Sequence, residues 1–387
     1  MKLNKRINAM SLFANVGIAE AYLKEIGIDV VLANEIDSQR VRFYKHLYPE
    51  TNMIEGDITD GNVKIKLINL AKKQKIELIM ATPPCQGMST AGKMLKNDAR
   101  NALITHAIEI IKEVKPNFVF LENVPEQLKT EIIYNKKEIL IPDYIKQELG
   151  EIYNFSDENI INAADYGVPQ TRSRAIILLT KKDISYKWNF PKKESKQVTL
   201  EDSIGNLPSL DPELYDLTSE EQLKVFPDFE EKKQKGLAVS KWHYPPKHVY
   251  RQVYSLMHTP SGQTAFNNPE ELRPRKQDGT FVKGFKNTYK RQSWDKPGYT
   301  ITMYNRTIGS QNNVHPGRYI GQNSNKHDIY SDARVLTIYE LMLVSSLPKN
   351  WNIPTWASDH FIRQVIGEGI PPLLVKKIMM ELITQYS

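Results

Sequence analysis

The stretch Leu78-Ile79-Met80-Ala81-Thr82-Pro83-Pro84-Cys85-Gln86-Gly87 joins an apolar run to a loop with two prolines and a thiol. We expect Leu78–Met80 to be a buried strand, because a short apolar run bounded by turn residues is typical of one. Cys85 is the single cysteine of the chain. A lone cysteine is usually a small buried apolar residue. At the end of a strand, in a polar loop stiffened by prolines, it is also a candidate nucleophile.

Similar apolar runs recur on both sides of this stretch and alternate with helical patterns. The other predicted strands are Ile7–Phe13, Val30–Ala33, Met53–Glu55, Phe118–Leu121 and Ala175–Thr180. The predicted helices are Ile18–Ile26, Ser38–Tyr48, Asn101–Val114 and the segment Phe361–Tyr386, interrupted by Gly-Glu-Gly-Ile-Pro-Pro. This alternation indicates an α/β fold with a doubly wound, mostly parallel sheet. Ligands of such sheets bind outside the carboxyl ends of the strands.

The composition is that of an ordinary globular protein, with 387 residues, 25% charged and 40% hydrophobic. There are 52 Lys and Arg against 45 Asp and Glu, and the net charge of +7 permits a polyanionic partner. A single cysteine excludes a disulfide within the chain and a multi-cysteine zinc site, so we expect no metal. No apolar run is long enough to span a bilayer. We therefore expect a cytoplasmic protein without membrane contact.

The character of the chain changes after residue 185, where proline, aromatic and charged residues dominate. Residues 201–231 hold ten acidic residues and one lysine, whereas residues 232–300 hold fourteen basic and four acidic residues. Each block is either a solvated surface or, for the basic block, a surface that contacts phosphates. We expect residues 186–355 to form a second, smaller lobe of mixed structure.

Two further strand ends carry ionisable side chains. Glu122 follows the strand Phe118–Leu121, where burial would raise its pKa and let it act as a proton donor. The alternative is a carboxylate that caps a helix. Gln170, Arg172 and Arg174 alternate along an extended segment, so all three could point into one cleft. The alternative is a strand edge protected by charge.

A cofactor loop is predicted after the first strand, at Phe13-Ala14-Asn15-Val16-Gly17. It is a poor dinucleotide fingerprint because Gly17 is its only glycine, but Asn15 can adopt the left-handed conformation. Glu35 and Ile36 end the second strand, where an acid bonds ribose hydroxyls. Asp57 and Ile58 end the third strand, well placed for the amino group of an adenine.

In this order, the motifs resemble those of the C5-cytosine DNA methyltransferases of bacterial restriction-modification type, over essentially the full length. The matching segments are the loop from Ser11, Glu35, Asp57, Pro84-Cys85-Gln86, Glu122-Asn123-Val124, Gln170-x-Arg172-x-Arg174, Arg291 with Trp294, Pro297 and Thr300-Ile301, His315-Pro316, Arg334-Val335-Leu336-Thr337 and Gly367-Glu368-Gly369-Ile370-Pro371-Pro372. The chain departs from the family pattern at four positions. Ser11 stands where an acid is usual, Asn15 and Ile18 where glycines are common, and Glu368 where Asn is usual.

The resemblance implies a class I, Rossmann-like domain at 1–185 that binds S-adenosylmethionine (SAM), a target-recognition lobe at 186–355, and a C-terminal helix at 356–387 that returns to the first domain. It implies a DNA (cytosine-5-)-methyltransferase that flips a cytosine out of duplex DNA and attacks C6 with Cys85. The implied catalytic residues are Cys85, Glu122, Arg172 and Arg174. The implied cofactor contacts are Phe13, Asn15, Gly17, Glu35, Ile36, Asp57, Ile58, Pro84 and Glu368. The implied DNA contacts are Gln86, Ser89, Lys93, Arg100, Gln170, Lys286 and Arg291.

Three alternatives remain at this point. A tRNA cytosine-5 methyltransferase of the same family is disfavoured, because such an enzyme needs less sequence readout than the sizeable lobe at 186–355 offers. A catalytically silent DNA-binding protein would not need Cys85, Glu122 and Arg174 together. A nicotinamide dehydrogenase is disfavoured by the missing Gly-x-Gly-x-x-Gly. For the favoured function, we expect a monomer that modifies the same site as a cognate restriction endonuclease.

Overall fold

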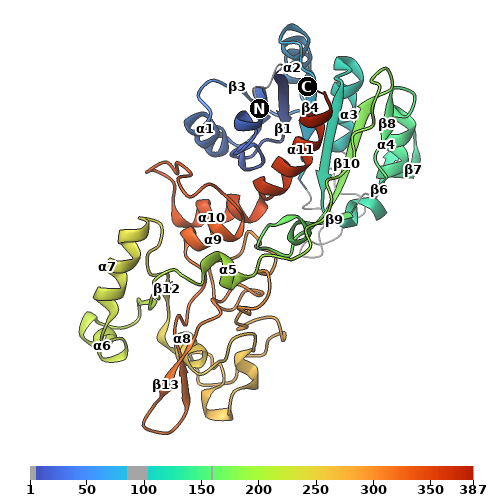
Figure 1. Cartoon of the computed structure of the whole chain (residues 1–387). Helices are drawn as coiled ribbons and strands as arrows, with labels where there is room; N and C mark the ends of the chain where they lie inside the picture. The colour runs from blue at the N-terminus through green and yellow to red at the C-terminus, as the bar shows by residue number, and fades with distance from the viewer. Residues whose placement is uncertain (1–5, 85–102, 158–159, 387) are drawn as a thin grey trace.

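The computed structural model describes residues 6–84, 103–157 and 160–386. At its centre lies an eight-stranded sheet of order β3-β2-β1-β4-β5-β10-β8, with β9 paired to β10 beside this path (Figure 1). Its strands are β1 (Ile7–Leu12), β2 (Ile28–Glu35), β3 (Asn52–Glu55), β4 (Leu78–Ala81), β5 (Phe118–Asn123), β8 (Tyr153–Phe155), β9 (Ile160–Asn162) and β10 (Ser173–Lys181). Strands β1 to β5 run parallel, and β10 is antiparallel to β5. The predicted α/β fold with a mostly parallel sheet is confirmed.

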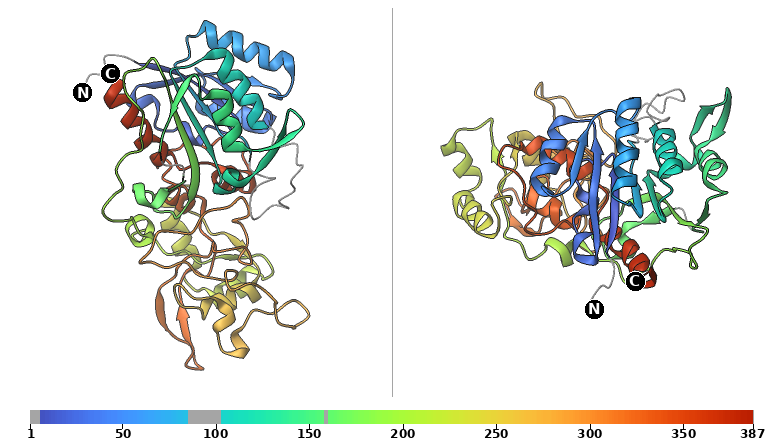
Figure 2. Two further views of the ribbon diagram at one scale, coloured as in Figure 1. Left: turned by 90° about the vertical axis from the view of Figure 1, so that its right-hand side faces the viewer. Right: turned by 90° about the horizontal axis from the view of Figure 1, so that it is seen from above.

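Helices cover both faces of this sheet, because successive side chains of a strand point to opposite faces. The covering helices are α1 (Ser38–Leu47), α2 (Gly61–Lys73), α3 (Leu103–Val114), α4 (Ile141–Leu149) and α11 (Pro372–Tyr386). In β1, Met10 and Leu12 belong to the core shared with α2, α3 and α4, whereas Ile7 and Ala9 belong to the core shared with α11. The left view of Figure 2 shows α11 on one side of the sheet and α2 to α4 on the other.

The segment Ile18–Ile26 is not the single helix that its apolar pattern predicts. It forms two 3₁₀ turns, η1 (Ile18–Glu20) and η2 (Lys24–Ile26). Its backbone bonds run from residue i+3 to residue i, as in Glu20 N to Gly17 O and Gly27 N to Lys24 O. The segment begins after the left-handed Gly17 and ends at the left-handed Gly27, and its i+3 to i bonds are those of 3₁₀ turns.

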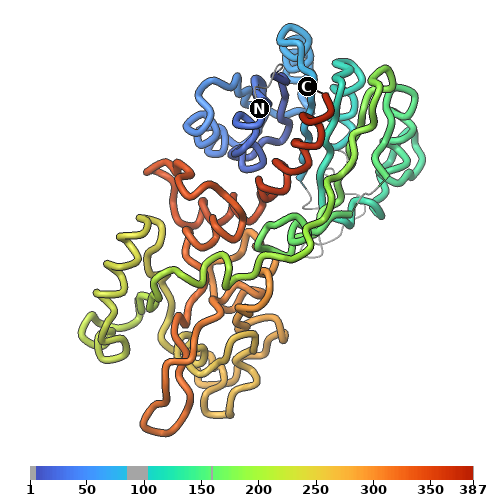
Figure 3. The backbone as a smooth tube through the Cα atoms, in the orientation of Figure 1, coloured from blue at the N-terminus to red at the C-terminus, as the bar shows by residue number. Residues whose placement is uncertain are grey.

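A second lobe lies below the sheet in Figures 1 and 3. Short elements build it: α5 (Leu200–Ile204), β11 (Glu213–Leu214), α6 (Ser219–Val225), α7 (Phe229–Val239), β12 (Lys247–His248), α8 (Tyr250–Met257), β13 (Tyr319–Gln322) and β14 (Asp328–Tyr330). It has its own core, which includes Leu256, Val314 and Val335. The first lobe also carries a hairpin, β6 (Glu131–Tyr134) with β7 (Lys137–Leu140). Among the described residues, no helix is both long and apolar enough to cross a membrane.

The helices α9 (Ile338–Val344) and α10 (Asp359–Glu368) lie between the two lobes. Their apolar side chains share a core with Val16 and Ile18 of the loop after β1 and with Leu200 of α5. The predicted C-terminal helical segment is thus α10 followed by α11. The boundaries at residues 185 and 355 stay a prediction, since α9 and α10 form one core across the second of them.

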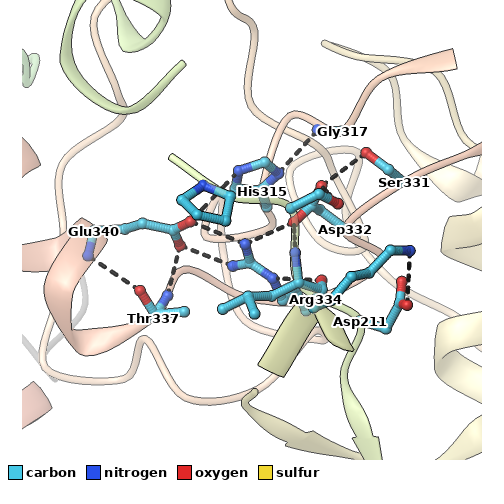
Figure 4. A network of polar contacts seen from close by, with 12 residues as sticks. Asp211, His315, Gly317, Ser331, Asp332, Arg334, Thr337 and Glu340 are labelled. Carbon is cyan, nitrogen blue, oxygen red and sulfur yellow. Dashed lines mark hydrogen bonds and ion pairs between the residues drawn. The ribbon is translucent and has the colours of Figure 1, made fainter. Parts of the chain in front are cut away.

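A buried ionic cluster connects the second lobe to α9 (Figure 4). Arg334 is fully buried and lies 2.7 Å from a carboxylate oxygen of Asp332 and 2.8 Å from one of Glu340 in α9. Its Nε donates to the carbonyl of Leu210 at 2.9 Å, and His315 Nε2 lies 3.6 Å from Glu340 Oε1. Buried charges are tolerated when each has its partners. The cluster therefore holds α9 in a single position on the lobe.

Candidate active site

The loop after β1 has an unusual backbone that the end of β2 holds in place. Phe13, Asn15 and Gly17 have φ values of 59°, 50° and 79°, in the left-handed region. The amide N–H of Asn15 donates to Glu35 Oε2 at 2.9 Å. Non-glycine residues persist in this region when their surroundings fix them. The loop is therefore shaped for close approach by a ligand at the carboxyl ends of β1 and β2.

The remaining predicted cofactor residues border this loop. Glu35 is buried, and its Oε1 accepts from the N–H groups of Ile36 and Asp37. Ile36 is 62% exposed, so its side chain is available to pack against a flat ring. Asp57 is exposed after β3, while Ile58 is buried in the core. The predicted positions Phe13 to Asp57 thus share one edge of the sheet.

The C-terminal segment returns to the same edge through Glu368, the last residue of α10. A carboxylate oxygen of Glu368 lies 2.8 Å from Arg40 Nη2 in α1. Burial raises the pKa of Glu368, and so does the nearby carboxylate of Glu35, whereas the charge of Arg40 lowers it. Arg40 is a residue that the sequence did not reveal, because a surface arginine on a helix carries no signal of its own.

The predicted proton donor is paired with one arginine. Arg174 Nε lies 2.8 Å from Glu122 Oε1, and both side chains are about nine-tenths buried. Burial raises the pKa of Glu122, while the charges of Arg174 and Arg172 act in the opposite direction. The side chain can therefore donate or accept a proton in a site from which water is largely excluded.

The Pro-Pro-Cys loop begins beside this pair. Cys85 itself and the predicted DNA contacts Gln86, Ser89, Lys93 and Arg100 lie outside the described residues. The strand before the loop, β4, pairs in parallel with β5, which carries Glu122. Asn123 Nδ2 donates to the carbonyl of Pro83 at 3.0 Å. The half-buried Pro84, next in the chain, thus enters the loop at the end of β5 that carries Glu122.

Arg172 and Gln170 do not join Arg174 in this pair, contrary to the prediction that all three share one cleft. Alternation holds along this segment, because Thr171 and Ser173 are exposed and the residues on either side of them are buried or half-buried. The three inward side chains nevertheless bond different partners. Arg172 is buried, and its guanidinium donates to the carbonyls of Ile301 and Gly367 at 2.7 and 2.9 Å. Gln170 is buried and accepts from Ile301 N at 3.2 Å. The predicted DNA contact of Gln170 is therefore wrong, and both side chains connect the sheet to the second lobe.

Arg291 is also wrong as a DNA contact. It is fully buried, and its guanidinium donates to the carbonyls of Leu256, His315, Ser331 and Asp332. Its charge is used to hold chain segments together inside the lobe. Lys286 is exposed, as predicted, and lies beside Phe285, whose side chain is 77% exposed.

The loop after β1 has an open polar atom that suits a nucleoside cofactor. Asn15 Oδ1 is buried, with no hydrogen-bond partner among the described residues. It is an open acceptor at the loop that the sequence assigns to a cofactor, so the residues fit such a group. In the part of the chain that the structure describes, no group of three or more His, Cys, Asp or Glu side chains could hold a metal ion.

The fold and this site define a methyltransferase of the α/β class. The C-5 cytosine-specific DNA methylase family matches residues 7–384, and the chain belongs to it. The Type II methyltransferase M1.HgaI from Avibacterium volantium is 41% identical over 99% of this chain and 100% of its own length. M.DdeI from Desulfomicrobium norvegicum is 26% identical over 96% of this chain and 87% of its own length.

Solved structures show the same fold at low sequence identity. A putative DNA modification methyltransferase encoded within an Escherichia coli prophage has a TM-score of 0.62 and 22% identity, over 98% of this chain and 99% of that one. A mutant of DNMT2 from Spodoptera frugiperda has a TM-score of 0.61 and 16% identity, over 97% of this chain and 99% of that one. At these identities the likeness concerns the fold alone.

Proposed function

We propose that this chain transfers a methyl group from SAM to C5 of a cytosine in duplex DNA, as the modification enzyme of a Type II restriction-modification system. The observation that carries the proposal is the buried Glu122–Arg174 pair beside the entry of the Pro-Pro-Cys loop. The family membership and the relative named as a Type II methyltransferase support it.

Each protein group has a role that its chemistry allows. The thiolate of Cys85 adds to C6 of the cytosine, which makes C5 nucleophilic. Glu122 donates a hydrogen bond or proton at N3 and so stabilises the negative charge that develops on the ring. Arg174 holds Glu122 and the O2 side of the base. SAM, when bound, supplies the methyl group. A base from the solvent then takes the C5 proton, the C5=C6 double bond re-forms, and the C6–S bond breaks to return Cys85 as a thiolate.

The cofactor is assigned to the loop Phe13–Gly17 and to the ends of β2 and β3. Glu35 would accept from ribose hydroxyls, Asp57 would accept from the adenine amino group, and Ile36 would pack on the adenine ring. Pro84 and Glu368 would border this site from the other side. The fit rests on the strained loop and on the open acceptor of Asn15.

The DNA is assigned to the side of the molecule where the Pro-Pro-Cys loop and Glu122 face the second lobe. A base within a duplex cannot reach Glu122, so the target must flip out of the stack. Lys283, Phe285 and Lys286 are exposed on the second lobe and combine positive charge with an aromatic face. Such side chains suit contacts to phosphates and bases. A monomeric state, a cytoplasmic location and a cognate endonuclease belong to the same proposal.

The test is covalent capture on a duplex that carries 5-fluorocytosine at the target. Fluorine cannot leave C5 as a cation, so the bond between Cys85 and C6 should persist after methyl transfer. We expect a complex that survives denaturing electrophoresis, requires SAM and is absent with Cys85→Ala. Methylation of normal cytosine without any such adduct contradicts the addition–elimination path. Methyl groups found on an exocyclic nitrogen contradict the proposed reaction.

A further inference from the structure

Glu20 is a buried acid that the chemistry above does not use. It is 3% exposed and lies in η1, directly after the loop Phe13–Gly17. Its carboxyl group accepts a hydrogen bond from Tyr44 Oη of α1, and the hydroxyl of Ser11 on β1 lies near enough to lower its pKa. No ion pair to Glu20 is found among the residues that the structure describes. The two hydroxyl groups are thus its polar partners in an apolar setting.

These contacts connect the two ends of the loop. Ser11 precedes the loop and Glu20 follows it, so the proximity of their side chains brings the two ends of Phe13–Gly17 together. The N–H of Glu20 donates to Gly17 O at 3.2 Å, and the same carbonyl accepts from Tyr48 Oη at 2.7 Å. A Cβ at Gly17 would lie 2.3 Å from the Tyr48 ring. The end of the loop is therefore pressed against α1 with no free space.

The loop depends on such support because of its backbone. Three of its five residues are left-handed, and two of these three, Phe13 and Asn15, are not glycine. Such residues hold their conformation when the surrounding structure determines it. Glu35 fixes the loop from β2 by accepting from Asn15 N, whereas Glu20 fixes it from the opposite end. Loss of either carboxyl group frees one end of the loop.

We propose that Glu20 is a positioning residue for the cofactor, whose carboxyl group holds the loop Phe13–Gly17 in the shape that receives SAM. This inference rests on the proposed function. It assigns Glu20 no contact with the reacting atoms. The side chain acts through the loop, and its loss should affect cofactor binding rather than DNA binding.

Protonation of the Glu20 carboxyl group can be used to test this role. The polar and titratable groups that act on Glu20 or feel its charge are Ser11 on β1, Tyr44 on α1 and Tyr48 after α1. Burial raises the pKa of Glu20 to about 7. A sulfonium cation near the loop favours the ionised carboxylate. SAM binding should therefore release a proton from Glu20 near neutral pH.

The experiment measures the affinity of SAM by titration calorimetry for the wild type, Glu20→Ala and Glu20→Gln. We expect Glu20→Ala to weaken SAM binding about tenfold while KM for DNA changes less than about twofold. Glu20→Gln should stay within about threefold of the wild type, because its amide can still contact both hydroxyls. Proton release, measured in buffers of different ionisation enthalpy, should occur in the wild type and vanish in Glu20→Gln.

The matched control is Glu25→Gln, an exposed acid on the neighbouring turn η2, which should leave SAM affinity and proton release unchanged. If Glu20→Ala does not fold, Ser11→Ala and Tyr44→Phe each remove one hydroxyl group and should each weaken SAM binding about threefold. Unchanged SAM affinity in Glu20→Ala overturns the inference, as does a parallel loss of DNA affinity. A wild type that binds no SAM contradicts the proposed function itself.

Discussion

Arg174 reaches Glu122 across the antiparallel pair β10–β5, with 2.8 Å between Nε and Oε1. Ile176 is the residue directly opposite Glu122 in the ladder, so Arg174 is its diagonal neighbour on the same face. The arginine opposes the effect of burial on the pKa of Glu122. The position of β10 therefore influences the pKa of Glu122, because β10 carries Arg174.

Replacing Glu122 by Gln should abolish most turnover and keep DNA binding. The amide can still hydrogen-bond to the base, but it cannot supply a proton. We expect kcat to fall by about a hundredfold or more, and the DNA affinity to stay within about threefold. Single-turnover methylation and filter binding measure the two quantities. Normal turnover in this variant would move the donor role to another group.

The two arginines of the Gln-x-Arg-x-Arg motif should behave differently. Arg172→Ala removes buried bonds to the carbonyls of Ile301 and Gly367, so it should lower the free energy of unfolding by about 3 kcal/mol or more. Arg174→Ala should lower kcat with a much smaller effect on unfolding, because its partner Glu122 can take up a proton. Urea unfolding and methylation rates compare the two. Equal losses of stability would contradict the distinction.

The buried cluster of Figure 4 predicts a large loss of stability for Arg334→Ala. The change leaves Asp332 and Glu340 buried without their cation, which costs about 3–5 kcal/mol. Arg318→Ala is the matched control, since its pair with Glu201 is about half exposed and should contribute less than about 1 kcal/mol. Urea unfolding gives both values, and a small loss for Arg334→Ala argues against the cluster as the support of α9.

DNA binding should weaken steeply as salt rises, because each phosphate contact releases counterions. Lys283→Ala combined with Lys286→Ala should reduce the slope of log affinity against log salt by about one to two. Lys72→Ala, on the helix α2 far from the second lobe, should leave the slope unchanged. Fluorescence anisotropy with a labelled duplex measures all three proteins. An affinity that does not depend on salt would remove the role given to the basic block.

The buried Glu20 predicts how stability depends on pH. Its pKa is about 7 in the folded protein against 4.5 for a solvent-exposed glutamate, so the unfolded chain loses its proton first as pH rises. The free energy of unfolding should therefore fall between about pH 4.5 and pH 7, by up to about 3 kcal/mol from this group, and then level off. In Glu20→Gln this slope should be absent. Urea unfolding of both proteins between about pH 5 and pH 8 gives the difference.

The sequence predicted the fold well where a strand is buried on both faces. The strand at Leu78 is apolar throughout and the strand at Phe118 is apolar up to Leu121, and each lies where it was predicted. The helices α2 and α4 were not identified. Charged residues interrupt their apolar positions, and the packing against α3 that stabilises them is a tertiary effect. The turns η1 and η2 differ from the prediction, because the apolar spacing of the segment does not distinguish a 3₁₀ turn from an α-helix.

For the site, residue types at strand ends predicted which positions come together at the sheet edge, but not where long side chains point. Arg174 and Arg172 look equivalent in the sequence, yet one bonds Glu122 and the other bonds backbone carbonyls. In the sequence Arg291 resembles a phosphate contact. It is buried, as Arg172 is, because backbone carbonyls in irregular segments need hydrogen-bond donors. Arg40 and Glu20 required the packed structure, because neither belongs to a recognisable motif.

The packing of α11 on the sheet has a consequence for synthesis in the cell. The face of β1 that carries Ile7 and Ala9 is covered by Leu374 and Ile378, at the opposite end of the chain. A ribosome adds roughly 5–20 residues per second, so this apolar face is made tens of seconds before the helix α11 that packs on it. The nascent chain must be shielded during that interval, and a message truncated before the last helix yields a product that lacks the part of this core supplied by α11 and exposes that apolar surface to aggregation and proteolysis.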